Sequence, residues 1–130
     1  MSEMKITIQA ESYYLPEQSI MESKRFLWSY EITITNESDH IVQLLNRYWR
    51  ITDLSGHIEE VKGPGVIGLQ PIIKPGRKFA YSSLCQLMTP KGTMEGQYQM
   101  QTLEEVSFSI EIPKFALLSP ISDAQRGRLH

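Results

Sequence analysis

The feature that most constrains the fold of this chain is an alternation of apolar and polar residues with a period of two. It is clearest between Phe26 and Ile34, where the apolar side chains fall at Phe26, Trp28, Tyr30, Ile32 and Ile34. Successive side chains of a β-strand point to opposite faces, so this segment predicts a strand with one buried and one solvated face. Turn-forming residues follow at 36–39, and we expect them to close a hairpin onto the next strand.

The same alternation recurs in shorter segments along the chain. It predicts further strands at residues 6–10, 58–61, 78–82, 94–102 and 106–112, and Pro113 is expected to end the last of them. Between Ile41 and Thr52 the alternation changes phase, which predicts a bulge near Leu45 to Tyr48. The stretches 63–76 and 84–92 are rich in proline and glycine and are expected to be irregular.

These segments give about seven strands separated by turns, the spacing of a β-sandwich. No segment has the pattern of a capped amphipathic helix. The strands must therefore pair antiparallel, because a parallel sheet needs crossover helices. The sequence predicts one all-β domain, followed by a flexible C-terminal tail at 119–130.

Composition narrows the classes of function. The chain has 130 residues, of which 41% are hydrophobic, and a net charge of −2, which argues against gripping a nucleic-acid backbone. Cys85 is the single cysteine, so no internal disulfide forms and a reducing, cytoplasmic compartment is expected. No stretch approaches the roughly 18 apolar residues of a membrane span, and the first residues do not resemble a signal peptide.

A glycine-rich string at 63–68 has the form GxGxxG, with glycines at Gly63, Gly65 and Gly68. In a dinucleotide site such a string opens a helix, but here Pro71 and β-type sequence follow, so the Rossmann interpretation fails. Two interpretations stay open. The backbone N–H groups form an anion nest assisted by Lys62 and Lys74, or the glycines only permit a tight loop with positive φ.

Other candidate chemistry is sparse. His40, beside Asp39, and His57, near Glu59 and Glu60, are candidate metal ligands, although a metal site usually needs three or four convergent groups. Cys85 has no basic neighbour to activate its thiol, and no GxSxG motif occurs. We therefore expect no enzymatic activity and no cofactor.

The segment 46–50 interleaves arginines with Tyr48 and Trp49, a pattern that a base-stacking surface would use. In a half-buried strand, however, Trp49 belongs to the core and the arginines to solvent. Nucleic-acid binding is accordingly disfavoured.

Three long motifs identify a family. The run from Glu31 to Ser83 (EITITNESDHIVQLL and onward), TPKGTMEGQYQM at 89–100 and FSIEIPKFAL at 108–117 resemble the ApaG family in order, and the match spans about residues 5–118. One departure is the segment 101–106, which lacks a glycine common in the family's hairpin there. We therefore assign an ApaG domain to residues 1–118.

The resemblance implies an immunoglobulin-like, fibronectin type III-like sandwich. It also implies a link to cobalt and magnesium resistance and efflux, and a gene neighbourhood shared with a diadenosine tetraphosphate hydrolase. Similar domains in eukaryotic F-box proteins and in a polymerase-interacting protein serve protein interaction. The family's glycine-rich loop, at Gly63, Gly65 and Gly68 here, is a suggested pyrophosphate-binding element, and the family supplies no catalytic residues.

Two functions from different classes follow. The first is a non-enzymatic interaction module whose partner is another protein, bound through an exposed sheet face, a sheet edge or the 63–76 loop. The alternative is a small-ligand sensor that binds a nucleotide polyphosphate or a divalent cation through the glycine-rich loop. Exposed edge strands would also allow a homodimer.

Overall fold

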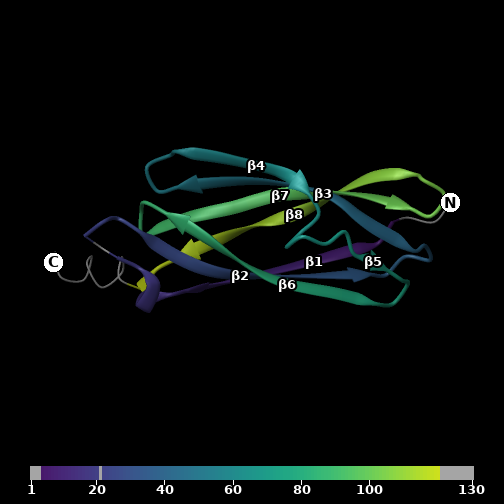
Figure 1. The fold of residues 1–130 in the computed structure, drawn as a ribbon, viewed down its shortest axis with the longest axis horizontal. Coiled ribbons are helices and arrows are strands. Elements are labelled where there is room, and N and C mark those ends of the chain that lie inside the picture. The colour runs from purple at the N-terminus through teal and green to yellow at the C-terminus, as the bar shows by residue number, and fades with distance from the viewer. Residues whose placement is uncertain (1–3, 21, 121–130) are drawn as a thin grey trace.

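The computed structural model describes residues 4–20 and 22–120 as an antiparallel β-sandwich (Figure 1). The strands are β1 (Ile6–Tyr14), β2 (Phe26–Asn36), β3 (Val42–Asp53), β4 (Ile58–Pro64), β5 (Ile72–Ile73), β6 (Lys78–Leu87), β7 (Lys91–Thr102) and β8 (Ser107–Leu118). One turn of 3₁₀ helix, η1, spans Pro16–Gln18. The all-β sandwich predicted from the alternation is confirmed, with the two-residue β5 added to seven longer strands.

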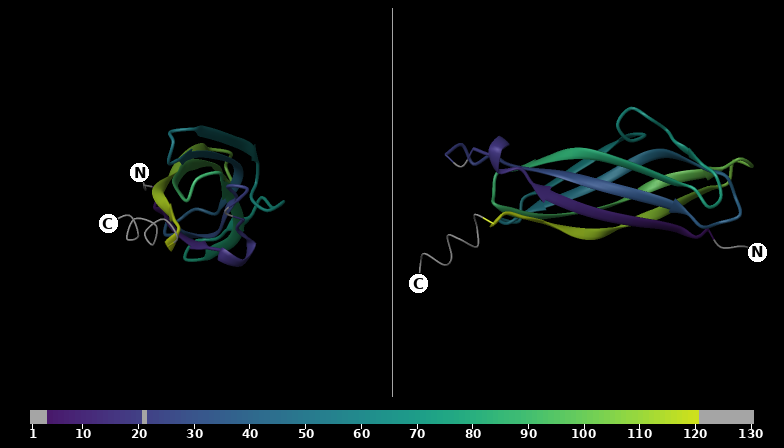
Figure 2. Two further views of the ribbon diagram at one scale, coloured as in Figure 1. Left: turned by 90° about the vertical axis from the view of Figure 1, so that its left-hand side faces the viewer. Right: turned by 90° about the horizontal axis from the view of Figure 1, so that it is seen from below.

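Two sheets face each other. One has the order β1-β2-β6, and the other has the order β4-β3-β7-β8 with β5 paired to the start of β3. This is the strand order of a fibronectin type III-like sandwich, and Figure 2 shows the two layers enclosing the interior. All of the pairings are antiparallel, as the absence of helical crossover segments required.

The core lies where the alternating residues predicted it. Along β2 every second side chain is buried, beginning at Phe26, and Trp28, Ile32 and Ile34 have no exposed surface. β7 contributes the fully buried Tyr98 from the opposite sheet. A single apolar cluster therefore fills the space between the sheets.

The hairpin predicted at 36–39 is wrong. β2 and β3 lie in different sheets, so this connection crosses the sandwich. The buried Asn36 holds the crossing: its Nδ2 donates to the carbonyls of His40 (2.7 Å) and Ile73 (2.9 Å), and its Oδ1 accepts from the Ser38 backbone N–H (3.0 Å). Turn-forming residues predicted the change of direction correctly, but they do not specify which sheet receives the next strand.

Two register shifts in the β3-β7-β8 sheet test the predicted bulge and the predicted end of the last strand. The bulge predicted near Leu45 is confirmed by a register shift between Leu44 and Asn46. Pro113 does not end β8, because it lies at a second register shift, opposite the step from Met94 to Gly96, where no regular ladder bond is needed.

The irregular stretch predicted at 84–92 is partly wrong, because β6 continues to Leu87 and β7 begins at Lys91. Cys85 and Leu87 extend the inward-facing parity of β6 and are both buried. Just before them, the outward side chain of Leu84 is exposed.

The two sides of the sandwich differ. β8 lies next to β1, and Ser12 Oγ donates to the Ala116 carbonyl across that side at 2.7 Å (Figure 2). On the other side the edge strands are β4 and β6, and an open groove separates them. The molecule thus has one closed and one open seam.

The tail predicted at 119–130 falls mostly on residues 121–130, which lie outside the described residues. Ser119 itself is buried against the domain. Within residues 4–20 and 22–120, no helix has the length and apolar character needed to cross a membrane.

Candidate functional site

The glycine-rich string forms the end of β4 and a tight two-residue turn. Val66 and Leu69 exchange both backbone hydrogen bonds at 2.8 Å, and the intervening Ile67 and Gly68 have φ of 44° and 78°. Two successive positive φ angles are typical of a type I′ turn. Gly68 adopts its positive φ without steric strain, whereas the β-branched Ile67 is strained at its positive φ.

Two backbone amides of this string are used within the fold. The Gly65 N–H donates to the Leu45 carbonyl at 2.8 Å, and the Val66 N–H donates to the Leu69 carbonyl. Both donors are therefore committed to the fold. An anion nest over 63–68 would need these N–H groups to point at one empty position.

The space left by two of the glycines has a structural use. A Cβ at Gly63 would lie 3.0 Å from the Arg47 guanidinium, and a Cβ at Gly65 would lie 2.2 Å from the Leu69 carbonyl oxygen. Arg47 Nη1 donates to the carbonyls of Pro64 (2.9 Å) and Gly65 (3.1 Å). The carbonyl groups of the loop therefore accept hydrogen bonds from the Arg47 guanidinium.

The two lysines proposed beside the loop diverge. Lys62 projects from the outer face of β4, where its Nζ lies 5.6 Å from the centroid of the Tyr48 ring. Lys74 follows β5, which pairs with the first residues of β3. The two lysines therefore lie at different levels of β3, Lys62 opposite Tyr48 and Lys74 just after the residue opposite Val42.

The two histidines proposed as metal ligands are also far apart. His40 precedes β3 and His57 follows it, so the length of a 12-residue strand lies between them. No group of three His, Cys, Asp or Glu side chains in the described part of the chain is placed to hold a metal ion. The structure therefore places His40 and His57 at opposite ends of β3 and does not bring them together.

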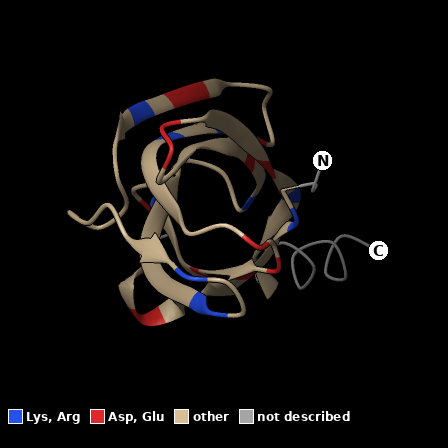
Figure 3. Cartoon of the chain, turned by 90° about the vertical axis from the view of Figure 1, so that its right-hand side faces the viewer, with Lys and Arg blue, Asp and Glu red and all other residues tan. Residues whose placement is uncertain are grey.

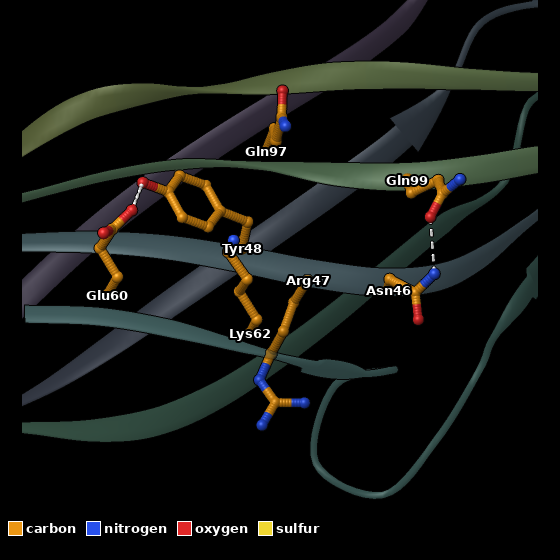
Figure 4. A pocket seen from close by; sticks show the side chains of 7 residues that line it. All are labelled: Asn46, Arg47, Tyr48, Glu60, Lys62, Gln97 and Gln99. Carbon is orange, nitrogen blue, oxygen red and sulfur yellow. Dashed lines mark hydrogen bonds between the residues drawn. The ribbon is translucent and has the colours of Figure 1, made fainter.

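The segment 46–50 divides between the two faces of β3. Trp49 is 3% exposed and packs edge-on against Tyr30 at 5.5 Å, as its assignment to the core predicted. Tyr48 lies on the outer face, where its hydroxyl donates to Glu60, and Asn46 Nδ2 donates to Gln99 Oε1 at 2.6 Å (Figure 4). The aromatic rings thus face opposite ways and form no common stacking surface.

The outer face of the β4-β3-β7 sheet is polar, and some of its side chains hydrogen-bond one another. In its shallow hollow Asn46 bonds Gln99 and Tyr48 bonds Glu60, and the hydrogen bond to Glu60 raises the pKa of Tyr48 (Figure 4). Lys114 and Glu95 form an ion pair across β7 and β8 at 3.8 Å. Such a face is solvated and provides little unpaired chemistry for a ligand.

The open seam between β4 and β6 is the more distinctive concavity. A hollow of about 530 Å³ lies there, with Tyr30, Trp49 and Met94 on its floor and Arg47 at one end. Val61 and Glu59 line it from β4, and the backbone of β6 from Ser83 to Gln86 lines it from the other sheet. We call this concavity the seam groove.

Cys85 lies in the wall of the seam groove. It is buried, and burial together with the nearby Glu59 carboxylate raises the pKa of its thiol to about 12. A thiol with so high a pKa is a poor nucleophile at neutral pH. The structure gives Cys85 a packing role.

Sequence reasoning missed the seam groove because its walls come from strands distant in the chain. The signal that could have indicated the groove is a difference in charge between the two strands that border it. β4 carries Glu59, Glu60, Lys62 and Pro64, whereas β6 has no charged residue between Phe79 and Leu87. Figure 3 shows charges of both signs on the β4 ribbon. Charged residues and proline at an edge discourage pairing with another strand.

The fold and the groove together define a fibronectin type III-like β-sandwich domain with one closed seam and one open seam. Comparisons with known proteins agree with this class. The model of the ApaG domain matches residues 16–102. The chain therefore belongs to the ApaG family.

Relatives and solved structures are similar along most of the chain. The chain is 49% identical to the protein ApaG of Allorhizobium ampelinum and 50% identical to that of Brucella anthropi, in each case over 88% of both chains. A crystal structure of the putative ApaA protein from Bordetella pertussis superimposes with a TM-score of 0.87 at 38% identity, covering 90% of this chain and 95% of that one. The family resemblance drawn from the sequence motifs is confirmed.

Proposed function

We propose that this chain is a non-enzymatic, cytoplasmic protein-interaction module whose working surface is the free edge of β6. The observation that carries the proposal is the contrast between the edges of the two sheets. β1 and β8 cover each other, and β4 carries charges and a proline. β6 alone among the described edges is long, open and free of charged residues from Phe79 to Leu87.

A free strand edge binds by β-augmentation. An extended segment of another protein adds to the sheet, main-chain hydrogen bonds provide affinity, and neighbouring pockets receive alternate side chains. Leu84, 58% exposed on β6, adds apolar surface beside that edge. No comparable donor set in the described residues favours a nucleotide sensor, because the Gly65 and Val66 amides are committed to backbone acceptors.

The proposal extends to metal homeostasis on the strength of the family resemblance alone. We propose that the partner belongs to the system that sets cobalt and magnesium resistance, so that the module acts on cation efflux through a protein contact. The prediction for cells is that losing the β6 edge has the same effect as losing the whole protein.

The test uses two exposed leucines as a matched pair. Leu84→Lys places a charge at the β6 edge, and Leu103→Lys places the same charge at the β7–β8 turn, where Leu103 is 69% exposed. Proteins captured by the wild-type chain should also bind Leu103→Lys but not Leu84→Lys. Cells carrying Leu84→Lys should show the cobalt sensitivity of a deletion. Equal capture by the two variants would refute the β6 edge as the working surface.

A further inference from the structure

The seam groove is longer than one hollow. A second hollow of about 590 Å³ adjoins the first and shares Ile51, Glu59 and Gln86 with it, and it continues past Leu87 to Met88. The combined groove runs beside the edge of β6 from the level of Arg47 to the end of the strand. A strand added to β6 would therefore lie along this groove.

The floor of the groove is apolar. Trp49 and Ile51 are buried in it, and the Trp49 indole N–H has no acceptor among the described residues. A buried donor without a partner is unfavourable, so a guest or solvent oxygen that reaches it is favoured. Alternate side chains of an added strand point into a groove of this kind, and the middle one should be apolar.

The two ends of the first hollow carry opposite charges. Arg47 lies at one end, where Nη1 bonds the loop carbonyls and the remaining guanidinium donors are left for a guest. Glu59 lies at the other end and has no hydrogen bond or ion pair within the described part of the chain. Beyond Glu59 the second hollow is also lined by Asp53 and Lys24. The Asp53 carboxylate already accepts hydrogen bonds from the backbone N–H groups of Ser55 and His57.

The strand ladder fixes the spacing of these charges. Glu59 pairs with Ile51 and Gly63 pairs with Arg47, so Glu59 and Arg47 lie four residues apart on one face, about 13 Å along the strand. The first hollow joins Arg47 to the stretch of β6 that begins at Ser83, and the second joins Glu59 and Asp53 to the end of β6 at Leu87, so β6 runs from the Arg47 level toward the Glu59 level. A guest that pairs antiparallel to β6 begins at Glu59 and ends at Arg47.

Resting on the function proposed above, we infer that the seam groove selects extended segments with the pattern basic-x-apolar-x-acidic, bound antiparallel to β6. The basic side chain meets Glu59, the apolar side chain covers Trp49, and the acidic side chain meets Arg47.

The occupant is a segment of another protein rather than a second copy of this chain. The inward side chains of β6, such as Tyr81 and Cys85, are buried in their own core. The β6 of a second copy would bring the same committed side chains and could not fill the groove. A free segment in extended conformation has side chains to place there.

The test uses two acetylated and amidated peptides of identical composition. One reads Val-Thr-Lys-Thr-Val-Thr-Glu-Thr-Val, and the other exchanges its lysine and glutamate. Backbone amide shifts of the full chain are followed by NMR during titration with each peptide. The wild-type chain should bind the lysine-first peptide about fivefold more tightly, with the largest shifts at residues 79–87. Glu59→Lys should remove or reverse that preference.

The outcomes separate the inference from the function on which it rests. Equal binding of both peptides, lost in Leu84→Lys and kept in Leu103→Lys, would overturn the charge pattern and leave the β6 edge standing. No shifts at 79–87 with either peptide at millimolar concentration would overturn both. Self-association of the free chain that Leu84→Lys abolishes would assign the groove to a second copy and overturn the choice of occupant.

Discussion

Two tyrosine hydroxyls meet in the middle of the sandwich. Tyr81 comes from β6 and Tyr98 from β7, so their 2.5 Å hydrogen bond joins the two sheets. Both side chains are buried, and burial raises the pKa of each hydroxyl. The alternation in the sequence predicted strands at 78–82 and 94–102, but it could not show that hydroxyls from these two strands would meet.

Removing both of these hydroxyls should cost less than the sum of the two single removals. Tyr81→Phe leaves the Tyr98 hydroxyl buried without its partner, and we expect the free energy of unfolding to fall by about 1–3 kcal/mol. Tyr98→Phe should behave alike, and the double variant should lose less than the sum. Urea unfolding of all four proteins measures this coupling energy. Additive losses would show that the bond contributes nothing.

Alkaline pH should destabilise the protein. The pKa of Cys85 is raised from 9.0 to about 12, chiefly by burial and then by Glu59, and the pKa values of Tyr81 and Tyr98 are raised as well. Since the folded state holds these protons more tightly, their contribution to stability is complete below about pH 9 and is lost as pH rises through the folded pKa values.

The measurement is the free energy of unfolding as a function of pH. It should fall between about pH 9 and 12, and Cys85→Ala should make the fall shallower by up to about 1.4 kcal/mol per pH unit. A free energy of unfolding that stays constant over this window would contradict the burial of these groups.

At the scale of elements, the sequence predicted the positions of the strands better than it predicted which strands pair with one another. The alternation predicted β2 and the phase change predicted the bulge in β3, because both depend on local side-chain parity. The crossing after β2 was missed, because the two carbonyls that Asn36 bonds do not both lie nearby in the chain: Ile73 comes from β5. Pro113 was misjudged because a bulge removes the need for its N–H.

The glycine-rich turn offers a test with two matched positions. Gly65 and Gly68 both have positive φ, but only a Cβ at Gly65 meets a close atom, the Leu69 carbonyl oxygen at 2.2 Å. Gly68→Ala should therefore cost about 1 kcal/mol of backbone strain. Gly65→Ala should cost clearly more, because the turn must also move.

Thermal unfolding of the two glycine variants, compared with the wild-type chain, measures this difference. Equal melting temperatures would mean that the turn has room at Gly65. If the turn moves as expected, the Arg47 guanidinium also loses its acceptors at Pro64 and Gly65, and residues at that end of the seam groove should show shifted amide signals.

At the scale of the whole molecule, function depends on what the two sheets leave uncovered. One pair of edges closes, and the other leaves a groove with an apolar floor, a charge at each end and, along its side, a strand without charged residues from Phe79 to Leu87. The sequence contains the uncharged run of β6, but it does not reveal that β6 is an edge strand. That property follows from the crossing after β2, which local pattern cannot predict.

The direct test of the central claim is hydrogen–deuterium exchange of the chain in complex with a captured partner. Amides of an open strand edge exchange readily, and an added strand protects them through new main-chain hydrogen bonds. The account predicts slowed exchange concentrated at residues 79–87 of β6. Slowed exchange confined to the polar outer face of β3, β4 and β7, with β6 unchanged, would contradict it.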